Sequence, residues 1–326
     1  MHVSSLLAVL PLSLSLVMGV PVSPRANTCT RQSMTDMVST ILASMVAHDP
    51  STLPLASLYK ATENSHPAAV TMMTAWRTIV YAGEPSLMAI DTTNCTAYFA
   101  LDVDEGNALN ETILRGRFAV VNEEITEIEL FINRYRGDHG FSFSASELPG
   151  NYAPVMNPPS NRTVATRADL MYISTGLFAE ANSTVNVDNN CRFTELGWTV
   201  VDTGTYANGT TDPVQCGWPV AHPTDDNARV GLVVDEVLGL VVTSGVVPGK
   251  VYGYQNVSAF IPDKFPPAQA AQETWLASVQ GQYPVMQTLA ATGDTLEVLQ
   301  YYNGALQAMQ INVYLSGPNA TSAWLS

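Results

Sequence analysis

Positive charge is scarce in this sequence. Its 326 residues hold 14 lysines and arginines against 29 aspartates and glutamates, and only three of the bases are lysines. The net charge of −15 repels the phosphate backbone of nucleic acids and anionic lipids. We therefore expect no nucleic-acid partner.

Cysteine is also rare, and its spacing does not suit metal or redox chemistry. The sequence has no Cys-x-x-Cys pair, no cysteine–histidine cluster, no Gly-x-Ser-x-Gly elbow and no phosphate or dinucleotide loop. We expect no metal and no cofactor. Four cysteines allow three pairings, of which we favour Cys29 with Cys95 and Cys191 with Cys216, because each pair then lies within one half of the chain.

Long apolar runs are missing beyond the first residues. Residues 6–19 form an apolar core too short to span a bilayer, and Val17 and Gly19 are small residues at −3 and −1 of a cleavage point. We interpret residues 1–19 as a secretory signal peptide, with cleavage after Ala26 as the alternative. No later stretch has membrane-spanning length, so we expect no membrane anchor.

Acceptor sequences for N-glycosylation follow the signal segment, and each has the form Asn-x-Ser/Thr. Together with the signal peptide they predict a secreted, extracellular glycoprotein with structural disulfides. The acceptor residues are Asn94, Asn110, Asn161, Asn182, Asn208, Asn256 and Asn319.

Helical spacing comes first along the mature chain. Met34, Val38, Ile41 and Met45 share one helix face, and the pattern stops at Asp49-Pro50. The same reasoning predicts short helices around residues 55–62 and 70–76. The apolar period then changes to two, which predicts strands over 86–91, 96–103, 112–121 and 125–133, the last two joined by a turn at 122–124.

The plan of a helix followed by a sheet then repeats. Residues 149–159 are rich in proline and asparagine and are predicted to be a linker. Leu170, Ile173 and Leu177 mark a helix face, and Asn303-Gly304 is a strong hairpin signal. A further helix is predicted over 268–291, and strands are predicted over 199–201, 230–235, 238–242, 251–260, 296–302 and 306–315.

This repetition predicts the α+β class, with two units in tandem. The first unit covers residues 30–151 and the second covers 162–315. Residues 152–161 form the linker between them, and 316–326 form a C-terminal tail.

Several runs resemble an uncharacterised family of secreted fungal proteins. They are residues 87–95, Gly137-Asp138-His139-Gly140-Phe141, residues 191–198 and Val234-Asp235-Glu236. The second unit resembles the SnoaL-like, nuclear-transport-factor-2-like cone, in which helices close a curved, mostly antiparallel sheet over a deep pocket. The resemblance spans about residues 30 to 315 and implies a tandem of two such cones.

The chain departs from the pattern of that family at positions that matter for chemistry. Phe193 stands two places after Cys191, where the pattern has arginine, and Arg192 is displaced by one. Glu297 or Gln310 stands where histidines would fall. An activity that uses those histidines is therefore not supported by this sequence.

The resemblance implies a cofactor-independent isomerase, cyclase or dehydratase of secondary metabolism, acting on a small apolar fungal metabolite. The alternative is a non-catalytic secreted protein that binds a ligand or a host partner. The missing histidines favour this alternative, whereas a candidate acid–base cluster favours the enzyme.

That candidate cluster comprises His66, Glu63 and Asp91. A carboxylate three residues from an imidazole can set its tautomer and raise its basicity, which suits a general base. Asp91 ends an apolar strand, where burial would raise its pKa. The plain alternatives are a surface loop at His66 and an Asx turn at Asp91-Thr92-Thr93.

A second pair, Glu195 and Arg192, lies near the expected second disulfide. It could line the pocket of the second unit, and a structural ion pair explains the two residues equally well.

Overall fold

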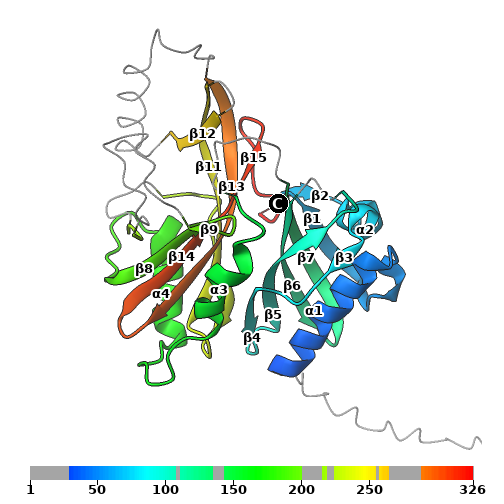
Figure 1. The fold of residues 1–326 in the computed structure, drawn as a ribbon, viewed down its shortest axis with the longest axis horizontal. Coiled ribbons are helices and arrows are strands. Elements are labelled where there is room, and N and C mark those ends of the chain that lie inside the picture. Colours follow the sequence, from blue (N-terminus) through cyan, green and yellow to red (C-terminus); the bar gives the residue numbers. More distant parts are fainter. Residues whose placement is uncertain are drawn as a thin grey trace, which may run out of the picture.

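The structure is a computed structural model that describes residues 29–107, 111–134, 143–199, 215–218, 224–254, 257–263 and 288–325. In these ranges the chain is mixed α+β, with two sheets and few helices (Figure 1). The predicted signal peptide, the motif at residues 137–141 and most of the helix predicted over 268–291 lie outside the described residues.

The first half opens with α1 (Arg31–Val46), which confirms the helix predicted from the methionine pattern. Thr30 and Ser33 form a capping box, in which each side chain accepts a hydrogen bond from the backbone N–H of the other. The remaining elements of this half are η1 (Pro50–Thr52), β1 (Leu55–Glu63), β2 (His66–Pro67), η2 (Val70–Met72), α2 (Ala75–Thr78), β3 (Tyr81–Ala82), β4 (Leu87–Asp91), β5 (Thr96–Asp104), β6 (Thr112–Val121) and β7 (Glu124–Arg134).

These strands form a seven-stranded first sheet in the order β2-β1-β7-β6-β5-β3, with β4 paired to β5. Strands β4 to β7 are consecutive antiparallel neighbours. The last of them, β7, also pairs in parallel with β1, the first strand of this half. Asn122 and Glu123 both have positive φ in the β6–β7 turn, which confirms the predicted hairpin.

The second half opens with α4 (Arg167–Phe178), again capped by a capping box, here between Thr166 and Asp169. A short helix, α3 (Leu148–Met156), precedes it. The strands are β8 (Val187–Glu195), β9 (Trp198–Thr199), β10 (Arg229–Asp235), β11 (Leu240–Tyr254), β12 (Val257–Pro262), β13 (Leu289–Tyr302), β14 (Ala305–Ile311) and β15 (Val313–Ser316).

The second sheet repeats the topology of the first. Its order is β10-β11-β13-β14-β8-β9, with β12 added to β11 and β15 added to β13. Strand β8 runs parallel to β14, as β1 runs parallel to β7, and the intervening strands are antiparallel. Asn303 and Gly304 have positive φ in the β13–β14 turn, which confirms the second predicted hairpin.

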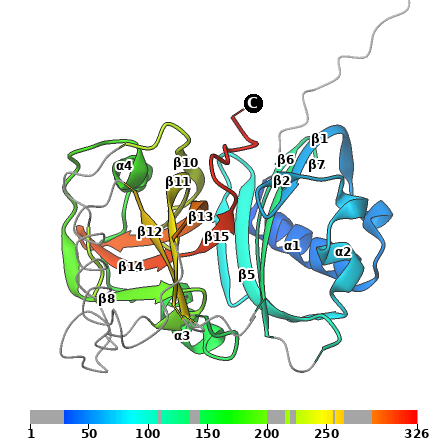
Figure 2. The same ribbon diagram turned by 90° about the horizontal axis from the view of Figure 1, so that it is seen from above.

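The two sheets pack face to face, with α1, α2 and α4 on their outer sides and α3 in contact with the shared core. Alternate residues of β5 divide between two cores: Phe99 packs with α1 and α2, whereas Tyr98 packs with residues of the second sheet. In the second sheet Val298 joins that shared core, whereas Leu299 packs with α4. Figure 2 shows α1 and α2 on the side of the first sheet that faces away from the second sheet.

A pseudo-two-fold relation links the halves through two reciprocal ion pairs. Arg31 follows the capping threonine of α1 and donates to Asp235 at 2.6 Å, while Arg167 follows the capping threonine of α4 and donates to Asp91 at 2.6 Å. Each aspartate is the last residue of a strand at the shared interface: Asp235 ends β10 and Asp91 ends β4. Each half therefore supplies one arginine and one buried aspartate to the other, as in an isologous dimer.

Backbone hydrogen bonds reinforce this reciprocity. The N–H of Ile90 donates to Asp235 at 2.9 Å, and the N–H of Val234 donates to Asp91 at 3.3 Å. In the turn that follows each aspartate, the residue four positions after the aspartate has a positive φ. These residues are Cys95 and Gly239. A Cβ at Gly239 would lie 2.5 Å from the carbonyl oxygen of Tyr301, so this turn has room only for glycine.

Three predicted elements differ from the structure. Residues 55–62 belong to strand β1 rather than a helix, although their apolar spacing is helical; Leu58 in that pattern is 90% exposed. The predicted linker contains α3, whose Tyr152 and Val155 are buried. Residues 289–291, at the end of a predicted helix, begin β13. Pairing with β7 and with β11 outweighs local propensity here.

Candidate functional site

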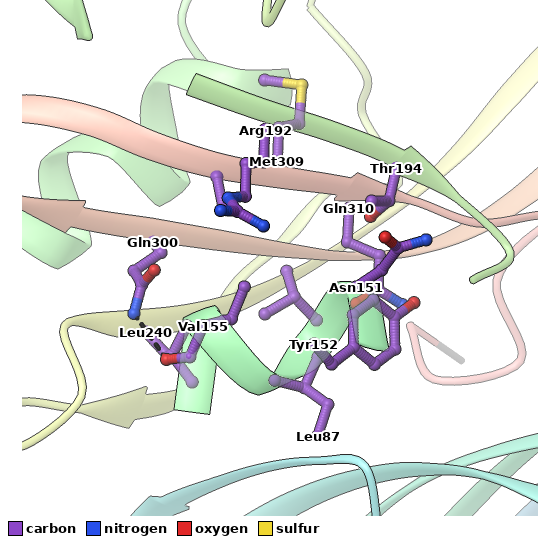
Figure 3. A pocket seen from close by; sticks show the side chains of 12 residues that line it. Leu87, Asn151, Tyr152, Val155, Arg192, Thr194, Leu240, Gln300, Met309 and Gln310 are labelled. Atoms are coloured by element: carbon purple, nitrogen blue, oxygen red, sulfur yellow. Dashed lines mark hydrogen bonds between the residues drawn. The ribbon is translucent and has the colours of Figure 1, made fainter. Parts of the chain in front are cut away.

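A small pocket lies between α3 and the inner face of the second sheet (Figure 3). Its cavity volume is about 10 Å³, counted as space open to the centre of a water molecule, so it holds about one water in this conformation. Its walls combine apolar and polar side chains, and Arg192 at its edge is exposed. The lining residues are Leu87, Asn151, Tyr152, Val155, Arg192, Thr194, Leu240, Val298, Gln300, Ala308, Met309 and Gln310.

The secondary structure fixes how these side chains converge. Tyr152 and Val155 lie three apart on α3, so both point from one helix face. Gln310 pairs with Val298 on one side and Thr194 on the other, and these three side chains form a row across the sheet. Gln300 donates to the carbonyl oxygen of Val155 at 2.8 Å and thereby ties α3 to β13.

Buried polar side chains without a well-directed hydrogen bond gather at and beside this pocket. The hydroxyls of Tyr98 and Tyr152 and both amide atoms of Gln310 are buried and make no such bond among the described residues, although Tyr98 lies beside Gln310 and Arg115, and Tyr152 lies beside Thr194. The same holds for two guanidinium nitrogens of Arg115, which is fully buried, donates to Asn133 at 2.8 Å and stacks on the ring of Phe131. Buried polar groups are normally satisfied, so such a group marks a functional candidate.

The two tyrosines and Arg115 form one electrostatic unit. Burial raises the pKa of Tyr98 to about 12, and the nearby charge of Arg115 opposes that shift. Burial likewise raises the pKa of Tyr152 well above its ordinary value, while burial lowers the pKa of Arg115. Both hydroxyls therefore stay protonated at neutral pH and can donate hydrogen bonds.

Glu297 is a buried carboxyl on the other face of β13 from the pocket residue Val298, because it pairs with Thr243, which bonds Ser174 of α4. Burial raises its pKa well above the ordinary value, partly offset by the positive charge of Arg115. The pocket side of the sheet therefore offers hydroxyl, amide and guanidinium donors, which suits recognition of a small polar or anionic group.

The structure brings His66 and Glu63 together but leaves Asp91 apart from them. His66 is exposed on β2 and lies opposite Glu63 in the pairing of β1 with β2. Glu63 accepts hydrogen bonds from the N–H groups of Thr74 at 2.7 Å and Ala75 at 2.9 Å, and so fixes the start of α2. Asp91 lies at the interface between the halves, where it binds Arg167. The hypothesis of an acid–base cluster in one apolar pocket is not supported by this placement.

Asp91 also has the opposite pKa shift from the one expected. Burial alone would raise its pKa, but the hydrogen bonds from Arg167 and from the N–H groups of Asn94 and Thr93 outweigh burial and lower it. The N–H groups of Thr93 and Asn94 donate to Asp91 Oδ1 at 2.9 and 3.1 Å. The Asx-turn alternative is therefore confirmed.

Glu195 and Arg192 do not form a pair across a pocket. They lie three apart on β8, so their side chains project from opposite faces of the strand. Only Arg192 lines the pocket.

The cysteines match the expected pairing in part. Cys191 and Cys216 form a disulfide, as predicted. Cys29 and Cys95 are free thiols rather than the predicted bridge. The two thiols lie close enough to form a hydrogen bond. Burial, this hydrogen bond and the charge of Cys95 together raise the pKa of Cys29 to about 12.

The glycosylation residues that the structure describes are all exposed. These are Asn94, Asn161, Asn182 and Asn319. The other three, Asn110, Asn208 and Asn256, lie outside the described residues.

Sequence reasoning missed Tyr98, Arg115, Tyr152 and the role of α3. Arg115 was a detectable signal, because it and Arg117 are two charged residues inside a mainly apolar strand of ten residues, and a buried charge calls for a partner or a function. Tyr152 gave no such signal, since its proline-containing segment resembles a linker.

Metal and membrane sites were also assessed within the described ranges. They contain no group of three or more histidine, cysteine, aspartate or glutamate side chains placed to hold a metal ion. None of the helices in these ranges has the length and apolar character needed to cross a bilayer.

Comparisons with known proteins give no relative on which to base a function. No protein-family model, no curated protein and no solved structure matches the chain. The function must therefore be argued from the site itself.

Proposed function

We propose that the protein is a secreted, non-catalytic ligand-binding glycoprotein. Its site is the pocket between α3 and the second sheet, and its ligand is a small molecule with a carboxylate directed toward Arg115 and an apolar part against Leu87, Leu240 and Val298. The observation that carries the proposal is the set of buried donors of Tyr98, Arg115 and Tyr152 beside the pocket, whose hydroxyls and two of whose guanidinium nitrogens make no well-directed hydrogen bond among the described residues.

The size of the pocket adds a condition. Because the cavity holds about one water molecule, a ligand of several atoms enters only if Tyr152 moves outward with α3. α3 is held by Asn151, which donates to the carbonyl oxygen of Gly197 at 2.7 Å and accepts from Thr199 at 3.0 Å, by Gln300, and by the sulfur of Met156, which accepts from the N–H of Met88 at 3.3 Å. The helix is short and connects to both sheets through these side-chain bonds, so we expect the opening motion to be its displacement by the ligand.

Binding accounts for the geometry better than the expected isomerase, cyclase or dehydratase activity. Of the proposed acid–base residues, Asp91 lies apart from His66 and Glu63, and each of the three has a structural role or an exposed position. Moreover, the space between α1, α2 and the first sheet, where the resemblance implies a pocket, is filled by buried side chains such as Met45, Phe99 and Phe118.

We also propose that both halves are SnoaL-like cones. In support, each half has a capped helix followed by antiparallel strands whose last member lies parallel to the first strand of the half. Fold similarity of this kind does not carry function.

Acetate and benzoate, each compared with its uncharged amide, are suitable probes for the site. We expect both carboxylates to raise the Tm of the full-length protein at about 10 mM, with benzoate stronger because its ring contacts the apolar wall. Tyr152→Phe and Gln310→Leu should each weaken this effect about 10-fold, since each removes one hydrogen-bonding group.

Tyr172→Phe is the matched control, because Tyr172 is an exposed α4 residue that bonds Thr184 outside the pocket. This variant should respond to benzoate like the parent. The proposal is wrong if the amides stabilise the protein as much as the acids do, or if Tyr152→Phe and Gln310→Leu leave the response unchanged.

A further inference from the structure

The two free thiols of the first half lie at a corner where α1 meets the turn after β4. This turn covers residues 92–95 and is called the interface turn below. Cys29 stands immediately before Thr30, the capping residue of α1, and Cys95 is the last residue of the interface turn. Their side chains are in hydrogen-bond contact, with Cys95 buried and Cys29 half-buried. Figure 1 shows the start of α1 beside the end of β4.

The pseudo-two-fold relation identifies the equivalent corner of the second half. Ala165 stands immediately before the capping residue of α4 and therefore corresponds to Cys29. Gly239 corresponds to Cys95, because each stands four residues after the interface aspartate. The second half thus builds this corner from alanine and glycine, so the fold itself does not require sulfur here.

Cys95 adopts a backbone conformation that glycine prefers. Its φ is 52°, and that of Gly239 is 69°. The carbonyl oxygen of Cys95 accepts from the N–H of Val120 at 2.9 Å, and that of Gly239 accepts from the N–H of Tyr301 at 2.8 Å, so the two turns are closed in the same way. A residue with a Cβ is strained at such a φ, whereas glycine is not. A strained cysteine in contact with a second thiol points to a use for the sulfur.

Each thiol lies next to a residue that the first half contributes to the reciprocal ion pairs. Cys29 is two residues before Arg31, which supplies the cation of one pair. Cys95 ends the turn that follows Asp91, which supplies the carboxylate of the other pair. N–H groups of the interface turn donate to Asp91 at 2.9 and 3.1 Å, so the turn also positions that carboxylate. A bond between the two sulfurs would therefore connect both contributions of the first half.

We propose that Cys29 and Cys95 are a reversible redox pair, whose thiols are the reduced state and whose disulfide is an oxidised state that fixes α1 to the interface turn. The bridge predicted from the sequence is then one of two states of this corner. Thiols in hydrogen-bond contact need only side-chain movement to reach the S–S bond length of about 2 Å.

The oxidant in this proposal is a small disulfide such as glutathione disulfide. Cys29, the more exposed thiol, attacks one of its sulfurs, forms a mixed disulfide and releases one glutathione. Cys95 then attacks the Cys29 sulfur and releases the second glutathione. Two electrons and the two thiol protons thereby pass from the protein to the two glutathione molecules.

Peptide mapping and thermal unfolding of the full-length protein in glutathione buffers test the pair. After equilibration with glutathione disulfide we expect a peptide linked through Cys29 and Cys95. We also expect a Tm about 5 °C above that of the protein with this pair reduced, because the bridge restricts the unfolded chain. Reduced glutathione should reverse both effects. Mapping that finds these two cysteines unpaired, or each joined to glutathione, would overturn the proposal.

Cys95→Gly is the matched variant, because glycine occupies the equivalent position of the second half and the Cys191–Cys216 bridge is kept. Its Tm should lie within about 2 °C of that of the reduced parent and should not respond to glutathione disulfide. Cys29→Ala, which copies Ala165, replaces it if Cys95→Gly does not fold. A response equal to that of the parent would assign the effect to the other disulfide and contradict the proposal.

Hydrogen exchange separates a local latch from general stabilisation. Oxidation should slow exchange about 10-fold in the first turn of α1 and in the interface turn, because the bridge joins these two segments. The first turn of α4 and the turn after β10, which form the equivalent corner without sulfur, should remain nearly unchanged. Equal slowing at both corners would refute the latch, and none of these outcomes depends on the ligand of the pocket.

Discussion

Glu297 makes the stability of the protein sensitive to pH at a single residue. Its carboxyl is buried without a well-directed hydrogen bond or an ion pair among the described residues, and burial raises its pKa in the folded state, whereas the unfolded chain ionises it freely. The folded state therefore keeps the proton at pH values where the unfolded state loses it. The favourable contribution of Glu297 to the free energy of unfolding is fully present below about pH 4. It is lost as the pH rises through the folded-state pKa.

We predict that Glu297→Gln stabilises the protein at neutral pH, by about 1–3 kcal/mol, and has little effect near pH 4. Urea unfolding at both pH values measures the difference. Glu124→Gln, at the exposed first residue of β7, is the control and should change neither value. The opposite trend would arise if Glu297 were ionised and paired in the folded state.

The disulfide is a second feature through which individual residues affect the free energy of unfolding. Cys191 and Cys216 are separated by 25 residues, and they join β8 to the segment near Gln215 that bridges to Arg192. We predict that replacing both by serine lowers the free energy of unfolding by about 2–4 kcal/mol, because the unfolded chain gains freedom. The check is urea unfolding of the variant beside that of the parent. An unchanged midpoint would mean that the neighbouring core already fixes this loop.

At the scale of elements, the antiparallel strands of the first half could be predicted from the sequence, whereas its first strand, β1, could not. Residues 96–103 and 112–121 alternate between two buried faces and are bounded by turns, so period and boundaries agree with β5 and β6. β1 carries a helical pattern, but its parallel partner β7 lies far along the chain, and local spacing contains no information about that pairing. α3 was hidden for a similar reason, because only contact with the second sheet buries Tyr152.

The candidate site was predicted poorly because it depends on the same long-range contacts. Sequence reasoning sought chemistry in His66 and Glu63, which are close in the chain, and in Asp91 at the end of a later strand. The pocket instead joins Leu87 of β4 to α3, β8, β11, β13 and β14, and only the packing of the two sheets brings Tyr98 to Gln310.

The reciprocal ion pairs give a prediction about the helices that supply them. Arg31 on α1 and Arg167 on α4 occupy equivalent positions and bind the equivalent aspartates Asp235 and Asp91, both buried. We predict that Arg31→Met and Arg167→Met each cost about 2 kcal/mol, because each leaves a buried carboxylate without its cation. Thermal unfolding of both variants measures the two costs.

Arg77→Met is a suitable control for the reciprocal pairs, because Arg77 lies exposed in the last turn of α2. It should leave the Tm nearly unchanged. If one of the two interface substitutions were neutral while the other was costly, the interface would not have the two-fold character inferred from its contacts.

At the scale of the whole molecule, the two repeated halves are not independent domains. One apolar core contains Leu87, Ile113 and Phe131 from the first half together with Leu240 and Leu296 from the second. The reciprocal aspartates, α3 and Trp324, whose indole N–H donates to Thr62 of the first sheet, also connect the halves. Separating the sheets would expose this core along with several buried charged groups, so neither half has a complete surface without the other.

We therefore predict that both sheets unfold in a single transition. Hydrogen exchange measured by mass spectrometry at increasing urea should show amides of β5 and β6 losing protection at the same urea concentration as those of β11 and β13, because all four strands border the shared core. Helix α3 should lose protection earlier, since it is short and must move to admit a ligand. Benzoate bound in the pocket should delay exchange in α3 most. Two separate transitions for the sheets would mean that each half keeps its own core intact, and the shared core would then contribute little to stability.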